Sequence, residues 1–428
     1  MLTAITGINW GDEGKGRMVD LLSQEYDIVV RYQGGNNAGH TVVNPRGRFV
    51  LNLLPSGILR PEVACVMGGG MVIDPRHLER EMAALREKGV AISPANLKIS
   101  DRATLCMPHH VLEDGLEEER LAKTGAQFGS TRRGIAYAYG DKYMKKTLRM
   151  GDLLHLDGSV RQRLETILEW KNLTLTGVYG AEPFSAETAW AELCHYADVL
   201  GEYICDTGEY LAAADDAGKR ILFEAQLGAL RDIDFGIYPY TSSSNVIGAY
   251  APIGAGIPGR RLDRSIGIMK AYSSCVGEGP FAAELAMTKE EQDALRTAGH
   301  EFGAATGRPR RVGPFDVVAS RYGVACQGAD ELALTLLDVL DYMETIPVVQ
   351  KYLVDGKETD RFPMGGALAA AKPVVTALPG WRCDISGCRS WAELPKAAQD
   401  YVLYLEQAGG CRIAYISVGP DREACIRR

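Results

Sequence analysis

Three glycine-rich segments of this 428-residue chain combine charged side chains with backbone suited to binding anions. The first, Gly7-Ile-Asn-Trp-Gly-Asp-Glu-Gly-Lys-Gly16, follows an apolar run and precedes an expected helix over 17–24. A strand-to-helix turn of this kind presents backbone N–H groups to phosphate, and Lys15 adds a cation. The turn departs from the GxxxxGK[ST] phosphate loop, because Asn9 and Gly16 replace its first glycine and its hydroxyl residue.

Asp12 is the unusual residue of this turn, because a carboxylate repels phosphate groups. It fits a phosphate site only if it binds Mg²⁺ or removes a proton from a substrate. A tight turn without chemistry is the alternative, but such a turn needs no charges at these positions.

Two further segments carry groups that could complete such a site. His40 closes the glycine-rich run 31–41, and a histidine beside phosphate can act as a general acid. In the segment 301–311, Arg308 and Arg310 stand near Thr306, and paired guanidinium groups suit a dicarboxylic acid. A solvated basic loop is the alternative for this third segment.

The elements that must position these groups follow from apolar patterning. We expect strands over 2–8, 27–30, 64–67, 316–319, 346–349 and 412–416, and helices around 78–85, 332–340 and 394–405. This alternation is typical of an α/β fold with a large, mainly parallel central sheet covered by helices. We expect one domain over 1–428, with residues from about 103 to 220 as a helical insertion.

Composition narrows the function classes. The net charge of −8 argues against a general nucleic-acid partner. No apolar stretch approaches the length of a membrane span. The ten cysteines form no CxxC pair, so we expect reduced thiols and a cytoplasmic protein.

Taken together, the segments Trp10–Gly16 and Gly34–His40 resemble the WGDEGKG and GGNNAGH turns of adenylosuccinate synthetases. Ordered matches continue along nearly the whole chain. They include Gly134–Lys142, Asp232–Tyr240, Ser242–Asn245, Val276–Phe281, Glu301–Arg311, Leu378–Trp381 and Ser417–Arg422. The resemblance implies the P-loop-like fold of that family.

The resemblance also implies a ligase activity. Family members join L-aspartate to the 6-oxo position of IMP through a 6-phosphoryl intermediate and hydrolyse GTP with Mg²⁺, as homodimers with shared active sites. By resemblance, Asp12 removes the N1 proton and ligates Mg²⁺ with the carbonyl of Gly39, and His40 stabilises the transferring phosphoryl group.

The remaining expected site residues are carried over by position. Those expected to bind the nucleotide are Gly14, Lys15, Gly16, Thr41, Arg310, Asp338, Ser417 and Gly419. Those expected to bind the acceptor are Asn37, Thr131, Lys145, Gln226, Leu227, Ser242 and Arg308. Those expected to bind aspartate are Gly303, Ala304, Ala305, Thr306, Arg308 and Arg310.

Several of these positions depart from the family pattern. Leu227 takes the place of a glutamine at the IMP site, while Gln226 lies one residue earlier. Lys145 replaces the arginine expected to reach across the dimer, and it lacks the guanidinium fork. Leu336 replaces a lysine beside the guanine-reading Asp338, which leaves ATP open as a donor. Ser242, Ala305 and Cys275 replace two threonines and an arginine.

These departures leave alternatives. A paralogue could aspartylate a related 6-oxo nucleotide such as GMP, dGMP or an analogue. A regulatory GTPase would need an intact phosphate loop and an Asn-Lys-x-Asp motif, which this chain lacks. A nucleotide-binding module without chemistry would be poorly served by Asp12.

Overall fold

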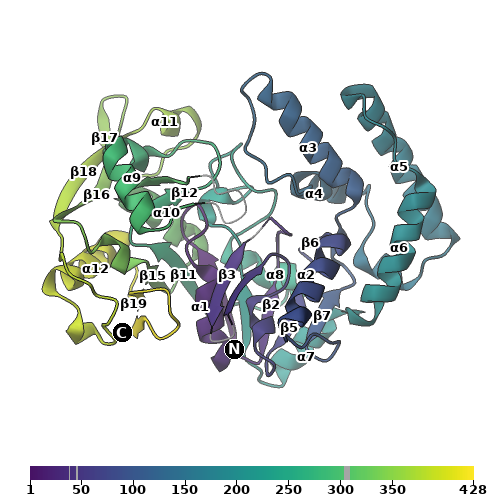
Figure 1. The fold of residues 1–428 in the computed structure, drawn as a ribbon, viewed down its shortest axis with the longest axis horizontal. Helices are drawn as coiled ribbons and strands as arrows, with labels where there is room; N and C mark the ends of the chain where they lie inside the picture. The colour runs from purple at the N-terminus through teal and green to yellow at the C-terminus, as the bar shows by residue number, and fades with distance from the viewer. Residues whose placement is uncertain (38, 45–46, 303–308) are drawn as a thin grey trace.

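A ten-stranded sheet forms the centre of the molecule (Figure 1). The computed structural model describes residues 1–37, 39–44, 47–302 and 309–428. From edge to edge the strands are β20 (Cys425–Arg427), β19 (Ile413–Ser417), β15 (Glu331–Thr335), β11 (Arg264–Lys270), β1 (Leu2–Gly7), β10 (Ile221–Glu224), β2 (Ile28–Arg31), β5 (Ala64–Met67), β7 (Leu97–Ser100) and β9 (Ile204–Cys205). Within these described residues, every pairing is parallel except that of β20 with β19.

These strands could be predicted from the sequence because strands buried on both faces are runs of apolar residues. Every residue of β1, β2, β10 and β19 is buried, as expected for a parallel sheet covered on both sides. The expected strands over 2–8, 27–30, 64–67 and 412–416 are confirmed to within one or two residues. The predicted α/β fold with a large, mainly parallel sheet is therefore confirmed.

Helices of the described residues pack on this sheet and on the elements around it. They are α1 (Lys15–Leu22), α2 (Pro75–Glu87), α3 (Pro108–Ala122), α4 (Ile135–Met144), α5 (Gly158–Tyr179), α6 (Ala186–Leu200), α7 (Thr207–Asp216), α8 (Ala251–Ala255), α9 (Lys289–Ala298), α10 (Val317–Gln327), α11 (Gly365–Ala369) and α12 (Lys396–Gly409). The stretch from about 103 to 220 is largely helical, and it also contributes β9 to the sheet edge. Figure 1 shows α3, α5 and α6 gathered on one side of the molecule.

Smaller sheets complete the fold. They are β3 (His40–Asn44) with β4 (Gly47–Leu51), β6 (Val72–Ile73) with β8 (Thr104–Leu105), β12 (Ser273–Cys275) with β13 (Arg311–Gly313), and β16 (Thr345–Val354) with β14 (Phe315–Asp316), β17 (Lys357–Thr359) and β18 (Lys372–Pro379). The expected strand over 346–349 lies in β16. Among the described helices, none combines the length and the apolar character that crossing a membrane requires.

Two predicted elements are wrong. The run 316–319 is not a strand, because the Asp316 side chain accepts the backbone N–H of Ala319 and starts α10 there. The segment 332–340 is not one helix. It forms β15 and a 3₁₀ turn over Leu337–Leu340, separated by Leu336 at φ +59°. The leucine spacing also fits a buried strand followed by a turn, so periodicity alone misled the prediction.

Candidate active site

Polar residues meet where the parallel strands end. Ligands of open α/β sheets bind outside the carboxyl ends of the strands. The turn 7–16 follows β1, and the strands nearest to β1 in the sheet also end on polar residues: Arg31, Glu224, Lys270 and Thr335. This edge is therefore the place to look for chemistry.

Glu13 shapes the turn after β1. Its buried carboxylate accepts the backbone N–H groups of Asn9 at 3.0 Å and Gly11 at 2.8 Å. It also pairs with Lys15 Nζ at 2.5 Å, so the lysine cation is held inside the turn. Gly14, at φ +94°, precedes the first residue of α1. Three of the predicted phosphate-binding residues, Gly14, Lys15 and Gly16, thus lie together where the turn ends and α1 begins.

The structure brings Asp12 to the third glycine-rich segment. Asp12 Oδ2 lies 3.1 Å from Arg310 Nη2, and 37% of the Asp12 side chain is exposed. Arg310 Nη1 also lies 2.8 Å from Glu301 Oε2, and Lys270 Nζ lies 2.5 Å from Glu301 Oε1. Burial alone would raise the pKa of Glu301, but Lys270 and Arg310 hold that pKa below its usual value. An ionised Glu301 therefore anchors Arg310 beside Asp12.

His40 packs against the same turn from the start of β3. A Cβ added to Gly16 would lie 2.7 Å from His40 Cβ, so only glycine allows this approach. His40 Nδ1 lies 2.5 Å from Glu224 Oε1, and Glu224 also accepts the N–H of Ser56 at 2.7 Å. Because Glu224 engages Nδ1, Nε2 is the ring nitrogen left for a substrate.

Burial and charge set the protonation of this buried pair. Burial lowers the pKa of His40, although Glu224 opposes the shift. Burial alone would raise the pKa of Glu224, but His40, Arg31 and Ser56 keep it below its ordinary value. Glu224 is therefore the charged partner, and a neutral His40 gains a proton readily when further negative charge arrives.

A second cluster lies at the ends of β15 and β19. Asp338 Oδ1 is buried and has no hydrogen-bond partner among the described residues, and burial raises the pKa of this carboxyl. Arg17 donates to Ser417 Oγ, which donates to the carbonyl of Gly419 at 3.3 Å. Thr335 Oγ1 donates to the carbonyl of Glu13 at 2.7 Å, which ties this cluster to the phosphate turn. The predicted base-reading and phosphate-binding residues are thus adjacent.

A cavity of about 750 Å³ opens beside Asp12. Its walls include the expected acceptor-binding residues Asn37, Thr131, Leu227 and Ser242. Its volume and mixed lining suit a nucleotide-sized ligand.

Two other predicted acceptor residues lie outside this cavity. Gln226 is buried and exchanges hydrogen bonds with Gln33, each donating to the other's backbone carbonyl at 2.9 Å. Leu227, at φ +62°, is therefore the residue of this pair that faces the ligand space. Lys145 is exposed at the end of α4 and does not line the cavity of its own chain.

The remaining predicted residues fall in two groups. Gly39 is exposed and precedes His40, and Thr41 is half-buried in β3. Gly303, Ala304, Ala305, Thr306 and Arg308 lie outside the described residues.

Sequence reasoning missed three buried carboxylates that organise the site, namely Glu13, Glu224 and Glu301. Each holds a predicted residue: Glu13 holds Lys15, Glu224 holds His40 and Glu301 holds Arg310. A signal for Glu224 existed, because a charged residue that ends the apolar run Ile221–Glu224 needs a buried partner.

This chain is similar to known proteins over nearly its whole length. A sequence profile of the adenylosuccinate synthetase family matches residues 4–426. The adenylosuccinate synthetase of Heliobacterium modesticaldum is 46% identical over 423 residues, covering 99% of this chain and 97% of that protein. The fully ligated adenylosuccinate synthetase of Plasmodium falciparum matches with a TM-score of 0.91 and 32% identity, over 100% of this chain and 99% of that one.

A more distant structure shares the fold. The succinoaminodeoxyadenylate synthetase of cyanophage S-2L, bound to dGMP and dATP, matches with a TM-score of 0.58 and 19% identity, over 99% of this chain and 94% of that one. At 19% identity the cyanophage protein shows a shared fold alone, whereas the adenylosuccinate synthetases above are 32% and 46% identical to this chain. Since a family profile and a 46% identical relative both span nearly its whole length, the chain belongs to the adenylosuccinate synthetase family.

Proposed function

We propose that this chain joins L-aspartate to IMP and hydrolyses GTP, giving adenylosuccinate, GDP and phosphate. The observation that carries the proposal is the meeting of Asp12, His40 and Arg310 around one phosphate-binding turn. The paralogue that uses a related nucleotide is not favoured, because the full-length match at 46% identity is to an adenylosuccinate synthetase.

The residues present divide the reaction into two steps. Asp12 removes the N1 proton of IMP, so that O6 attacks the γ-phosphoryl group of GTP and GDP leaves. His40 Nε2 donates to the transferring phosphoryl group, and Glu224 holds the ring for this contact. The amine of L-aspartate then attacks C6 and displaces phosphate, with Arg310 placed to bind the aspartate carboxylates.

Both the nucleotide and the metal fit the side chains available. The buried, unpartnered Oδ1 of Asp338 suits the N–H donors of guanine. Asp12 and the carbonyl of Gly39 offer the oxygen ligands that Mg²⁺ takes. When bound, Mg²⁺ would supply positive charge against the phosphate oxygens. We also propose that the enzyme acts as a homodimer in which Lys145 reaches the partner's acceptor site.

Phosphate release with L-aspartate tests the proposal. The assay crosses IMP, GMP and dGMP as acceptors with GTP and ATP as donors. We expect strong release with IMP and GTP alone, together with the absorbance change of adenylosuccinate. Faster turnover with dGMP than with IMP, or with ATP than with GTP, would contradict the proposed substrates.

A further inference from the structure

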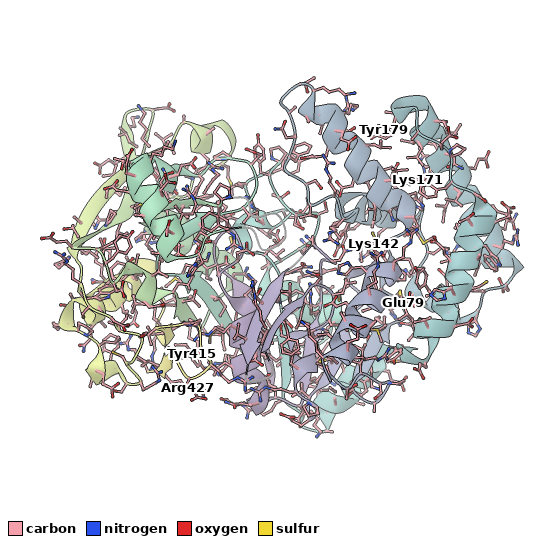
Figure 2. All side chains as sticks on the ribbon, in the orientation of Figure 1. Glu79, Lys142, Lys171, Tyr179, Tyr415 and Arg427 are labelled. Carbon is pink, nitrogen blue, oxygen red and sulfur yellow. The ribbon has the colours of Figure 1, made fainter. Side chains whose placement is uncertain are left out.

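Helix α3 meets the rest of the molecule through polar side chains. The helix is described throughout, and its buried residues are His109, His110, Glu113, Asp114 and Glu118. Glu113 pairs with Lys171 Nζ of α5 at 2.8 Å; Lys171 is labelled in Figure 2. Asp114 and Glu118 instead face the loop that connects α3 to α4.

Glu118 organises the first half of that loop. Its carboxylate accepts three consecutive backbone N–H groups, those of Phe128 at 3.3 Å, Gly129 at 2.6 Å and Ser130 at 3.0 Å. Glu118 is itself only 7% exposed, so its carboxylate is largely shielded from water, although Phe128 and Gly129 are exposed. Hydrogen bonds to an ionised acceptor are the stronger kind, so they fix the backbone of the loop.

Asp114 organises the second half. It accepts the hydroxyl of Ser130 at 2.6 Å and the backbone N–H of Gly134 at 2.8 Å. Gly134 has φ +72°, and a Cβ there would lie 2.7 Å from the backbone of His110. The loop thus lies directly against α3 before α4 begins.

The two carboxylates fix the direction of the residues between their anchor points. Ser130 is bonded to both carboxylates and Thr131 follows it, before the bond to Gly134; both residues line the cavity beside Asp12. Two other described side chains also bond the backbone of this loop: Ser130 Oγ accepts the N–H of Arg132 at 3.1 Å, and the thiol of Cys106 lies 3.5 Å from the carbonyl of Arg133. Asp114 and Glu118 bind four of its backbone N–H groups, those of Phe128, Gly129, Ser130 and Gly134.

We propose that Asp114 and Glu118 are positioning residues for the acceptor nucleotide. They hold the 128–134 loop through Ser130, so that the next residue, Thr131, presents its hydroxyl and N–H groups to the phosphate of IMP. The inference rests on the proposed function, in which Thr131 contacts the acceptor. A competing interpretation is that Glu118 occupies an anion nest that would otherwise bind phosphate.

Steady-state kinetics of Glu118→Gln distinguish the two interpretations. The neutral amide turns an NH₂ group toward donors and loses part of the bonding. We expect the KM for IMP to rise about tenfold, since the free energy of one hydrogen bond to a charged group corresponds to about that ratio of binding constants. We expect kcat and the KM values for L-aspartate and GTP to stay within about twofold, because the phosphate is remote from the reacting C6. Calorimetric affinity for inosine, which lacks the phosphate, stays unchanged.

Two further variants control the experiment. Glu119→Gln removes an exposed ion pair between α3 and Arg132 of the same loop and leaves the KM for IMP unchanged. Ser130→Ala removes the bond to Asp114 without altering α3, and we expect it to raise the KM for IMP as well. This variant keeps the proposal testable if Glu118→Gln fails to fold.

Either of two results overturns the proposal. If Glu118→Gln and Ser130→Ala both keep the wild-type KM for IMP while their melting temperatures fall, the carboxylates have a purely structural role. A lower KM for IMP in Glu118→Gln means that Glu118 competes with phosphate. Failure of the proposed function is separate, because the wild-type protein would then make no adenylosuccinate from IMP.

Discussion

At the scale of single residues, the site depends on charged side chains held in unusual backbone positions. Asp12 has φ +58°, a conformation that Asp and Asn adopt more readily than other side chains. Asn at this position therefore keeps the turn while removing both the base and the negative charge beside Arg310. The substitution isolates the chemistry of the carboxylate from the shape of the turn.

We expect Asp12→Asn to lower kcat by about 10²–10⁴-fold, the usual contribution of a general base. Binding of GTP, measured by calorimetry, changes little, because the N–H groups of the turn remain. Turnover near the wild-type rate would exclude Asp12 as the base.

His40 gives a prediction about protons. Burial lowers the pKa of His40 in the free protein, so the ring is neutral near pH 7. The phosphates of GTP raise that pKa, so binding takes up as much as one proton per site, and affinity falls as pH rises from the pKa of the free protein to the higher pKa of the complex. Calorimetry in two buffers of different ionisation enthalpy measures the uptake. His40→Gln is the control and shows none; uptake that persists in this variant would assign the proton to another group.

At the scale of elements, strands were predictable where they are buried on both faces, as in β1, β2 and β10. The helix predicted over 332–340 failed because the same leucines suit a strand, a left-handed residue at Leu336 and a turn. The charged residues of the site, such as Asp12, Lys15 and His40, could be predicted because they stand in glycine-rich segments that follow expected strands. Their partners Glu224 and Glu301 were not, because only the three-dimensional fold brings them to His40 and Arg310.

The cap of α10 gives a prediction about stability. The carboxyl of Asp316 is buried, accepts from Ala319 N–H at 3.0 Å and Tyr352 OH at 2.5 Å, and burial raises its pKa to about 6. Between about pH 4 and 6 the folded state therefore holds a proton that the unfolded state has lost. Ionisation above this range costs stability, so this contribution is lost as pH rises.

Asp316→Asn keeps an acceptor and a polar partner but cannot ionise. Relative to wild type, the free energy of unfolding of this variant should improve by up to about 3 kcal/mol between pH 4 and 7, by denaturant titration. Asp157→Asn is the matched control, because hydrogen bonds from Ser159 and Val160 lower the pKa of that exposed α5 cap, so its difference from wild type changes below about pH 4 and stays flat between pH 4 and 7. A flat difference for Asp316→Asn would show that its carboxyl stays ionised in the folded protein at pH 4.

At the scale of the whole molecule, a net charge of −8 would repel anionic substrates, but cationic side chains are gathered near the phosphate turn. The cations near the phosphate turn are paired with buried carboxylates, as Lys15 is with Glu13 and Arg310 with Glu301. These pairs fix each cation without leaving it unpaired in the absence of ligand. We propose that the acceptor site receives a further cation from Lys145, which does not line the cavity of its own chain.

The position of Lys145 leads to a test of the proposed homodimer. Lys145 follows α4 at φ +62°, beside Tyr143 and Met144, which are 68% and 53% exposed. Lys145 has no ion-pair partner among the described residues, and exposed apolar side chains next to such a cation suit an interface with a second copy of the chain. Lys145→Ala should therefore lose activity, as Asp12→Asn does.

In a mixed dimer, the subunit with alanine at 145 keeps its own Asp12 and receives an intact lysine from its partner. Random reassortment of equal amounts should restore roughly a quarter of wild-type activity, since half of the dimers are mixed and each has one intact site. Activity that stays at the level of the separate variants after subunit exchange, followed by native mass spectrometry, would confine Lys145 to its own chain.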